Sequence, residues 1–243
     1  MTTPTFLVRT MSDTVETDIH RVFTICNEIL PRYQMAPLTF ERLRKIADGP
    51  FDLFLIPLIF SEEYKADRNL VFNETKRVEI RNQAIEIARK HRFDTDPPEF
   101  IPGIEPSLKS TQAAGLRNIL LTTGGRRYQH HAMESVGIGG YFEEIIDRDE
   151  TYFAKEQGIY HLFRKHNCDM RVILLSGTAS YIKAGNNLAH VQAGKTRLEV
   201  VTIAFATPYS YNDEETLAAA KPRIIIHGLN ELLAQLKSLD LSV

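Results

Sequence analysis

The sequence predicts an α/β protein built on a parallel sheet, and two features of the chain indicate this. The short apolar runs Phe6–Val8, Asn118–Leu121 and Arg171–Leu175 are followed by polar or small residues, as expected of buried strands that open onto a site. Later in the chain such runs alternate with helical patterns, which is typical of βαβ units. We therefore expect a Rossmann-like sheet, with any ligand beyond the carboxyl ends of its strands.

The segment after the first strand is predicted to be helical. From about residue 17, apolar residues recur three and four positions apart until Pro31 ends the helix. A second helix is expected to begin at Thr39 and to stop at Gly49-Pro50. The run Phe51–Phe60 is apolar nearly throughout, so we expect it to be buried, and Val78–Lys90 again has a helical pattern.

This helical segment is predicted to be an insertion. Residues 94–102 contain three prolines and indicate a linker. We therefore expect a helical cap over 17–92, inserted into a core of residues 1–16 and 93–243. The core elements expected after the linker are a helix over 105–114, a strand over 118–121, a helix over 128–136, a run at 141–146, a helix over 157–166, a strand over 171–175, a β-rich stretch at 198–205, a strand over 223–226 and a helix over 229–236.

Composition narrows the function classes. Apolar residues make up 43% of the chain and charged residues 25%, as in ordinary globular proteins, and the net charge of -2 gives no basic field for nucleic acid. No apolar run approaches the roughly 18 residues of a membrane span, and the start Met1–Pro4 does not have a signal-peptide pattern. Two distant cysteines, Cys26 and Cys168, are interpreted as reduced thiols. We expect a cytoplasmic protein without nucleic-acid or membrane partners.

Four fragments, taken together in their order and spacing, resemble the haloacid dehalogenase superfamily, and most closely its phosphoglycolate phosphatase and β-phosphoglucomutase-like proteins. Val15-Glu16-Thr17 is similar to the family's Val-Asp-Ser after its Gly-Thr-Leu. The stretch at 100–105 resembles the return from cap to core. Residues 141–146 are similar to Tyr-Phe-Asp-x-Ile-Ile, and residues 180–185 to Ser-Asp-Ile-x-Ala-Ala. The resemblance covers nearly the whole chain and implies a core with an inserted helical cap.

The resemblance also implies a reaction and the residues that perform it. In the family an aspartate ending strand one attacks phosphorus, a second aspartate two positions on protonates the leaving oxygen, and acids after strand four hold magnesium. A Thr or Ser after strand two and a later Lys hold the phosphoryl group. In this sequence the nucleophile position falls on Arg9 and the acid position on Met11. The phosphate-binding positions fall on Thr122 and Lys155, and the metal positions on Gly177 and Tyr181.

These substitutions predict a protein that has lost phosphohydrolase catalysis. Arginine stays protonated and cannot be an anionic nucleophile, and methionine cannot donate a proton. We therefore expect no catalytic residue and no cofactor, and a function in binding an anionic or phosphorylated ligand or a protein partner. Alternatively, the chain is an active divergent hydrolase or mutase that uses magnesium. In that case either a shifted register makes Asp13 the nucleophile or substituted residues take over the reaction.

Each candidate anion-binding residue also has a structural interpretation. Arg9 either anchors an anion or forms an ion pair with Glu16, Asp147 or Asp149. Thr122 and Thr123, before Gly124-Gly125, either present a hydroxyl and backbone N–H groups to an anion or form an ordinary helix cap and turn. Lys155 either reaches the site or is solvated.

Overall fold

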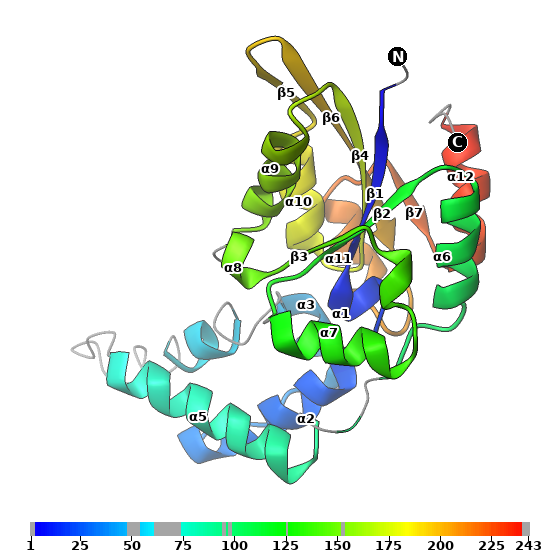
Figure 1. Ribbon diagram of the computed structural model, residues 1–243. Coiled ribbons are helices and arrows are strands. Elements are labelled where there is room, and N and C mark those ends of the chain that lie inside the picture. The colour runs from blue at the N-terminus through cyan, green and yellow to red at the C-terminus, as the bar shows by residue number, and fades with distance from the viewer. Residues whose placement is uncertain are drawn as a thin grey trace.

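The computed structural model describes residues 3–47, 54–60, 74–93, 96, 99–124, 126–151 and 154–239. Its centre is a seven-stranded sheet in the order β3-β2-β1-β4-β6-β5, with β7 also paired to β6 (Figure 1). The strands are β1 (Thr5–Thr10), β2 (Arg117–Leu121), β3 (Glu144–Ile146), β4 (Met170–Ser176), β5 (His190–Ala193), β6 (Thr196–Phe205) and β7 (Ile224–Ile226). Every pairing is parallel except the β5–β6 hairpin. The predicted α/β fold with a mainly parallel sheet is confirmed, and the antiparallel hairpin is an addition to it.

Helices cover both faces of this sheet, as Figure 1 shows. Apolar side chains of α6, α7 and α12 pack on one face with Leu7, Leu120 and Leu175. Those of α9 and α10 pack on the other face with Phe6, Val8 and Val172. The core helices are α6 (Ile104–Ala113), α7 (Arg126–Ser135), α8 (Arg148–Thr151), α9 (Lys155–His166), α10 (Ala179–Asn187), α11 (Glu214–Ala219) and α12 (Leu232–Ser238), with short 3-10 turns at Gly139–Tyr141 and Leu229–Glu231.

The helical segment between β1 and β2 has an apolar cluster of its own. It contains α2 (Ile19–Ile29), a 3-10 turn at Leu30–Tyr33, α3 (Phe40–Ile46), a helical stretch at 54–60 and α5 (Glu74–Lys90). Ile19, Leu43, Ile59 and Ile80 are among its fully buried members. The stop predicted at Gly49-Pro50 lies outside the described residues, as do parts of the 94–102 linker and of the 51–60 run.

The chain leaves the core and returns to it at neighbouring places. An isolated antiparallel bridge joins Glu16 to Phe100. The Thr17 N–H donates to the Glu99 carbonyl at 2.7 Å, and the Ile101 N–H donates to the Val15 carbonyl at 2.9 Å. This crossing places the helical segment beyond the carboxyl ends of the central strands (Figure 1). The division into a core of residues 1–16 and 93–243 and a cap of 17–92 stays a prediction.

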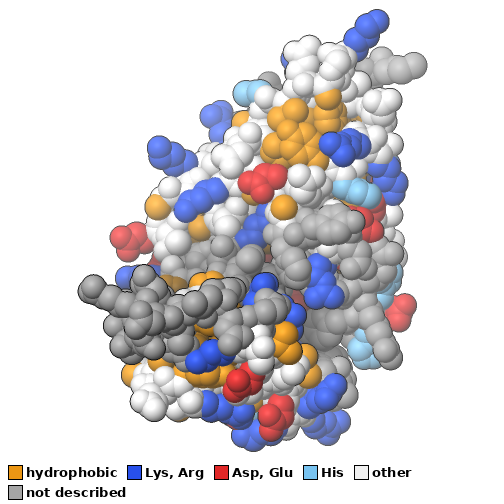
Figure 2. Space-filling view, turned by 90° about the vertical axis from the view of Figure 1, so that its left-hand side faces the viewer, with side chains coloured by type: hydrophobic (Ala, Val, Ile, Leu, Met, Phe, Trp, Pro, Cys, Tyr) orange, Lys and Arg blue, Asp and Glu red, His pale blue; other side chains and the backbone are white. Residues whose placement is uncertain are grey.

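The described surface carries charges of both signs. In the space-filling view of Figure 2, acidic and basic side chains are interspersed over the helical segment. None of the helices described has both the length and the hydrophobicity that a membrane crossing requires.

Candidate functional site

The carboxyl ends of the parallel strands meet at one edge of the sheet, and hydroxyl side chains gather there. Thr10 ends β1, Ser176 ends β4, and Thr122 follows β2 directly. Arg9 pairs with Leu120 on one side and with Leu175 on the other, so Thr10 is level with Leu121 and Ser176. The sequence predicts that this strand ends at Val8, with the family's nucleophile position, Arg9, at its tip. In the structure the strand runs on to Thr10.

A buried carboxylate lies among these hydroxyls. Asp13 belongs to the single helical turn α1 (Met11–Thr14) that follows β1, and it is 1% exposed. The Thr10 hydroxyl donates to one of its oxygens and the Thr178 hydroxyl to the other. The Gly177 N–H also donates to Asp13, and the Ser176 hydroxyl lies 3.5 Å from it. The Asp13 carboxylate therefore has bonds to residues from two separate strand ends.

Burial has the largest effect on the charge state of Asp13. Removal from water disfavours the ionised form and raises the pKa of this carboxyl above its usual value, although three influences oppose the shift. These are the hydroxyl donors Thr10 and Thr178, the Gly177 N–H and the positive charge of Lys155. The Asp13 carboxyl group is therefore buried, and its oxygens point at hydrogen-bond donors of the protein itself.

Gly177 makes room for this arrangement. A Cβ at this position would lie 2.8 Å from both Cβ and Oγ of Ser210, and 3.1 Å from Cβ of Asp13. The space that a side chain at 177 needs is therefore already taken by Asp13 and Ser210. Tyr181, at the other position where the family has a metal ligand, is 5% exposed and packs in the cluster on the α9 side of the sheet.

Arg9 lies away from the hydroxyl groups at the strand ends. Its side chain follows Leu7 onto the α6 face of the sheet, and it is fully buried. Nη2 donates to the Ser107 hydroxyl of α6 at 2.9 Å, while Nε and Nη1 have no hydrogen-bond partner among the described residues. Burial lowers the pKa of this guanidinium to about 9.

Within the described part of the chain the Arg9 guanidinium bonds to the Ser107 hydroxyl and not to the carboxylates of Glu16 or Asp147 that were considered as ion-pair partners. The side chain of Asp149 lies outside the described residues. Side chains alternate between the two faces of a strand, so the Arg9 side chain points to the opposite face from that of Thr10. This alternation explains why Arg9 lies away from the strand-end hydroxyls. Met11 is 1% exposed in the same apolar cluster as Leu7, so it does not reach the strand-end edge either.

Lys155 is a basic residue whose charge acts on the strand-end site. It begins α9 and is 6% exposed, although lysine is rarely so buried. Nζ donates to the Ser180 hydroxyl and lies 4.8 Å from the centre of the Tyr181 ring. Its positive charge lowers the pKa of Asp13, which places the two groups near each other.

Thr122 and Thr123 form the turn that the structural interpretation predicted. The Gly124 N–H donates to the Thr122 hydroxyl at 3.0 Å, and the Thr122 N–H donates to the Ile146 carbonyl at 2.9 Å. Both threonines are buried, with 4% and 7% exposure. These contacts define their positions and leave their role toward an anion as a prediction.

Sequence reasoning missed a second polar group near this edge. Asp18 accepts a hydrogen bond from the Tyr211 hydroxyl at 2.8 Å and another from the Ser12 hydroxyl. Burial raises the pKa of Asp18, and it raises the pKa of Tyr211 well above its usual value. Because residue 211 is about 190 positions away along the chain, no local pattern could reveal this contact.

The residues present do not fit the magnesium site that the resemblance implies. Magnesium prefers carboxylate and water oxygens in octahedral geometry. Gly177 and Tyr181 supply no carboxylate, and the oxygens of Asp13 already accept from Thr10 and Thr178. Within the described ranges no group of three or more His, Cys, Asp or Glu side chains is placed to hold a metal ion.

Comparisons with known proteins agree with this architecture. A family model described as haloacid dehalogenase-like hydrolase matches residues 10–188. A phosphoglycolate phosphatase of Pseudomonas savastanoi pv. phaseolicola is 24% identical over 172 residues, 68% of this chain and 58% of that protein. The chain thus matches less than two thirds of that relative's length. A phosphoglycolate phosphatase of Vibrio vulnificus is 25% identical over 170 residues, 68% of this chain and 70% of that protein.

A solved structure shows the same fold over almost the entire length. The crystal structure of a predicted phosphatase from Clostridium acetobutylicum superposes with a TM-score of 0.72 and 15% identity. The superposition covers 98% of this chain and 100% of that one. At this identity the likeness speaks for the fold, and the residues at the strand ends must be considered on their own.

Proposed function

This chain belongs to the haloacid dehalogenase-like hydrolase family, and from that premise we propose that it binds a phosphorylated or otherwise anionic small molecule without hydrolysing it. One observation carries the proposal. The residue that ends β1 is Thr10, and the nearby carboxylate of Asp13 is buried and bonded to the Thr10 and Thr178 hydroxyls. A carboxylate held in this way is not presented to a phosphorus atom.

The proposal is the same for two alignments of the first motif, and only the shifted register that makes Asp13 the nucleophile leads to the alternative considered below. If the nucleophile position is Arg9, the acid position two residues on is Met11. If the structural end of β1 is used instead, the two positions are Thr10 and Ser12. Neither alignment puts a carboxylate at either position, so neither provides the aspartyl nucleophile or the acid that the family reaction uses.

The binding half of the proposal rests on Lys155 and Thr122. A lysine that is almost completely buried beside the strand ends supplies a positive charge in a low-dielectric setting, where it attracts an anion more strongly than in water. The Thr122 hydroxyl accepts a hydrogen bond from the Gly124 N–H, and its own O–H is a second donor toward an anion. We leave Arg9 out of the proposed anion site, because its guanidinium is directed at Ser107.

The alternative is an active hydrolase that uses Asp13, and one observation favours it. The Asp13 carboxylate lies at the strand-end edge, and the positive charge of Lys155 lowers its pKa. A nucleophile that faces a phosphate would have a similar environment. The alternative also requires that Asp13 lose its hydrogen bonds from the Thr10 and Thr178 hydroxyls and become exposed. A protein partner and a cytoplasmic location stay predictions.

Ligand binding is tested with the full chain and two anions, inorganic phosphate and phosphoglycolate. The second probe is chosen because both curated relatives are phosphoglycolate phosphatases. We expect either anion to raise the midpoint of thermal unfolding in proportion to the logarithm of its concentration above its Kd. Lys155→Met should abolish this rise. Lys183→Met, on the exposed side of α10, is the matched control and should keep it. An equal rise in all three proteins contradicts the site.

Catalysis is tested separately with p-nitrophenyl phosphate and phosphoglycolate in the presence of magnesium. We expect no turnover above that of the buffer for the natural sequence. Turnover that disappears in Asp13→Asn but persists in Arg9→Met would establish the alternative. Binding and catalysis are thus read out by different measurements, so one can fail without the other.

A further inference from the structure

The loop at residues 206–213, which follows β6, joins the sheet core to the helical segment. It connects β6 to α11 and runs past the strand-end edge described above. Tyr211 and Asn212, in this loop, are 3% and 3% exposed, which is unusual for a connection that carries polar side chains. Their contacts explain why both are buried.

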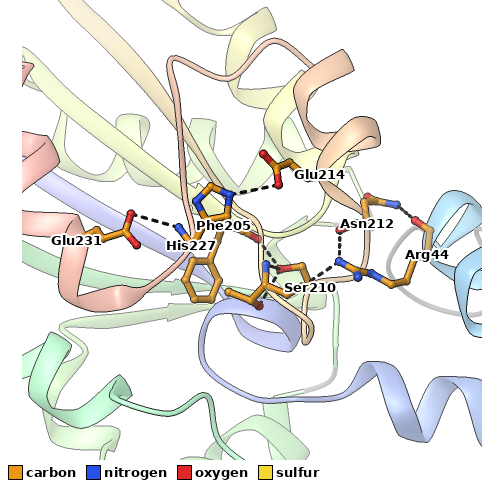
Figure 3. A network of polar contacts seen from close by, with 8 residues as sticks. Arg44, Phe205, Ser210, Asn212, Glu214, His227 and Glu231 are labelled. Atoms are coloured by element: carbon orange, nitrogen blue, oxygen red, sulfur yellow. Dashed lines mark hydrogen bonds and ion pairs between the residues drawn. The ribbon is translucent and has the colours of Figure 1, made fainter.

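Arg44 and Asn212 bind each other's backbone, as Figure 3 shows. Nη2 of Arg44, in the last turn of α3, donates to the Asn212 carbonyl at 3.0 Å and to the Thr207 carbonyl at 2.9 Å. In return, Nδ2 of Asn212 donates to the Arg44 carbonyl at 2.8 Å and to the Ala47 carbonyl at 3.2 Å. Four hydrogen bonds therefore cross between the end of α3 and this loop.

The same loop contacts the helical segment at a second place. The Tyr211 ring packs within the apolar cluster of that segment, beside residues such as Ile19 and Leu43. Its hydroxyl donates to Asp18, immediately before α2. Tyr211 thus buries core-domain surface inside the predicted cap, and two helices of the segment, α2 and α3, are held by neighbouring loop residues.

Asn212 also ties these contacts to the end of β4. Its N–H donates to the Gly177 carbonyl at 3.0 Å, and its Oδ1 accepts from the Ala179 N–H at 2.7 Å. The N–H and Oδ1 of Asn212 therefore bond to the core, while its carbonyl and Nδ2 bond to the end of α3. A displacement of α3 away from the sheet has to break these bonds or drag the 177–179 segment with it.

We propose that Arg44 and Asn212 form a latch that keeps the helical segment closed over the strand ends. Opening breaks the four bonds between α3 and the loop, and it leaves Nη2 of the half-buried Arg44 guanidinium, Nδ2 of Asn212 and the four carbonyls that accept from them without these partners. Access to the strand-end edge is then set by the release of the latch. This inference uses no ligand and does not depend on the proposed function.

Amide hydrogen exchange on the full chain, followed by mass spectrometry, tests the latch. Arg44→Ala lies in the helical segment, yet we expect faster exchange in two core segments, 177–179 and 206–213, on the order of tenfold, because several hydrogen bonds that hold the segment closed are lost. Exchange in the centre of β4 should stay unchanged. Asn212→Ala, from the other side of the latch, should accelerate exchange at the end of α3.

Arg42→Ala is the matched control, since Arg42 is an exposed arginine of the same helix. It should leave exchange in 177–179 and 206–213 as in the natural sequence. The latch is refuted if Arg44→Ala changes these segments by less than about twofold, or if Arg42→Ala accelerates them equally. It is also refuted if Arg44→Ala accelerates β4 to the same extent, because that result indicates general destabilisation.

Discussion

The Thr178 hydroxyl donates a hydrogen bond to the carboxylate of Asp13, 165 residues earlier in the chain. This contact joins the turn after β1 to the segment after β4 at the edge where a ligand of this fold is expected. Asp13 thereby serves as an internal acceptor for the two strand ends. Substitutions of its hydroxyl donors should therefore change the stability of the protein and the charge state and accessibility of the Asp13 carboxylate.

Thr178→Val should therefore destabilise the protein by on the order of 2 kcal/mol, because it removes a donor to a buried charged acceptor while keeping the shape of the side chain. Urea unfolding at pH 8 measures the loss. Thr24→Val, which removes an exposed hydroxyl that donates to the carbonyl one helical turn back, should change the free energy of unfolding by less than about 0.5 kcal/mol. Equal effects of the two substitutions contradict the assigned role.

The stability of Asp13→Asn relative to that of the natural sequence should increase as the pH rises. Burial raises the pKa of Asp13 in the folded protein above its unfolded value. The folded state therefore holds the proton more tightly. This contribution to stability is complete below the unfolded pKa of about 4 and is lost as the pH rises through the folded pKa. Asparagine carries no charge and loses nothing over that interval.

Urea midpoints at pH 4.5 and pH 8 measure the difference between the two proteins. We expect the midpoint of Asp13→Asn minus that of the natural sequence to be larger at pH 8. Glu215→Gln, which removes an exposed carboxylate, is the control and should show little dependence on pH. A difference that shrinks with pH would show that the hydroxyl donors outweigh burial.

How far the sequence predicts this structure differs between the fold and the site. The apolar runs of β1, β2 and β4 identify buried strands because each is covered on both faces. The sequence predicts the strand end two residues short because the charge of Arg9 interrupts the apolar run, whereas in the structure Arg9 is buried within the strand. The Asp13 and Asn212 contacts join distant parts of the chain, and no pattern at short spacing encodes them.

Helix α10 and strand β5 are among the elements that the sequence analysis does not predict, and both are missed for local reasons. Helix α10 contains Gly185 and two asparagines, which are poor helix formers, and it forms because its apolar face packs on β4 and β6. A Cβ at Gly185 would lie 2.5 Å from the Thr202 side chain, so the glycine permits that packing. Strand β5 is mostly exposed, and its signal was the turn at Gly194, whose φ is +63°.

Arg9→Met should stabilise the protein by on the order of 1–3 kcal/mol, because an apolar side chain of similar length replaces a buried cation, two of whose nitrogens have no hydrogen-bond partner among the described residues. Chemical denaturation measures the gain. Arg42→Met, at an exposed position, should stay within about 0.5 kcal/mol of the natural sequence. A loss of stability in Arg9→Met would mean that the guanidinium has a favourable partner in solution, such as a bound anion.

Gly177→Ala should cost about 1–3 kcal/mol, because its Cβ would lie 2.8 Å from the Cβ and Oγ of Ser210. Ser210→Gly removes both of those atoms, although it also removes the hydroxyl that donates to the Phe205 carbonyl (Figure 3). We expect the double variant to be more stable than the sum of the two losses predicts. Additive losses in this double-mutant cycle would contradict the steric explanation.

The two cysteines should differ sharply in reactivity. The thiolate is the reactive species, and burial raises the pKa of Cys26 to about 12, while Cys168 is half-buried next to the turn that ends α9. A chromogenic disulfide reagent at pH 8 should therefore modify one thiol quickly and the second only as the protein unfolds in urea. In Cys168→Ser the fast phase should vanish, and the rate of the remaining phase should follow the population of open molecules. Rapid modification of that variant in buffer would mean that α2 opens readily, which is incompatible with a helical segment held closed at Asp18 and Arg44.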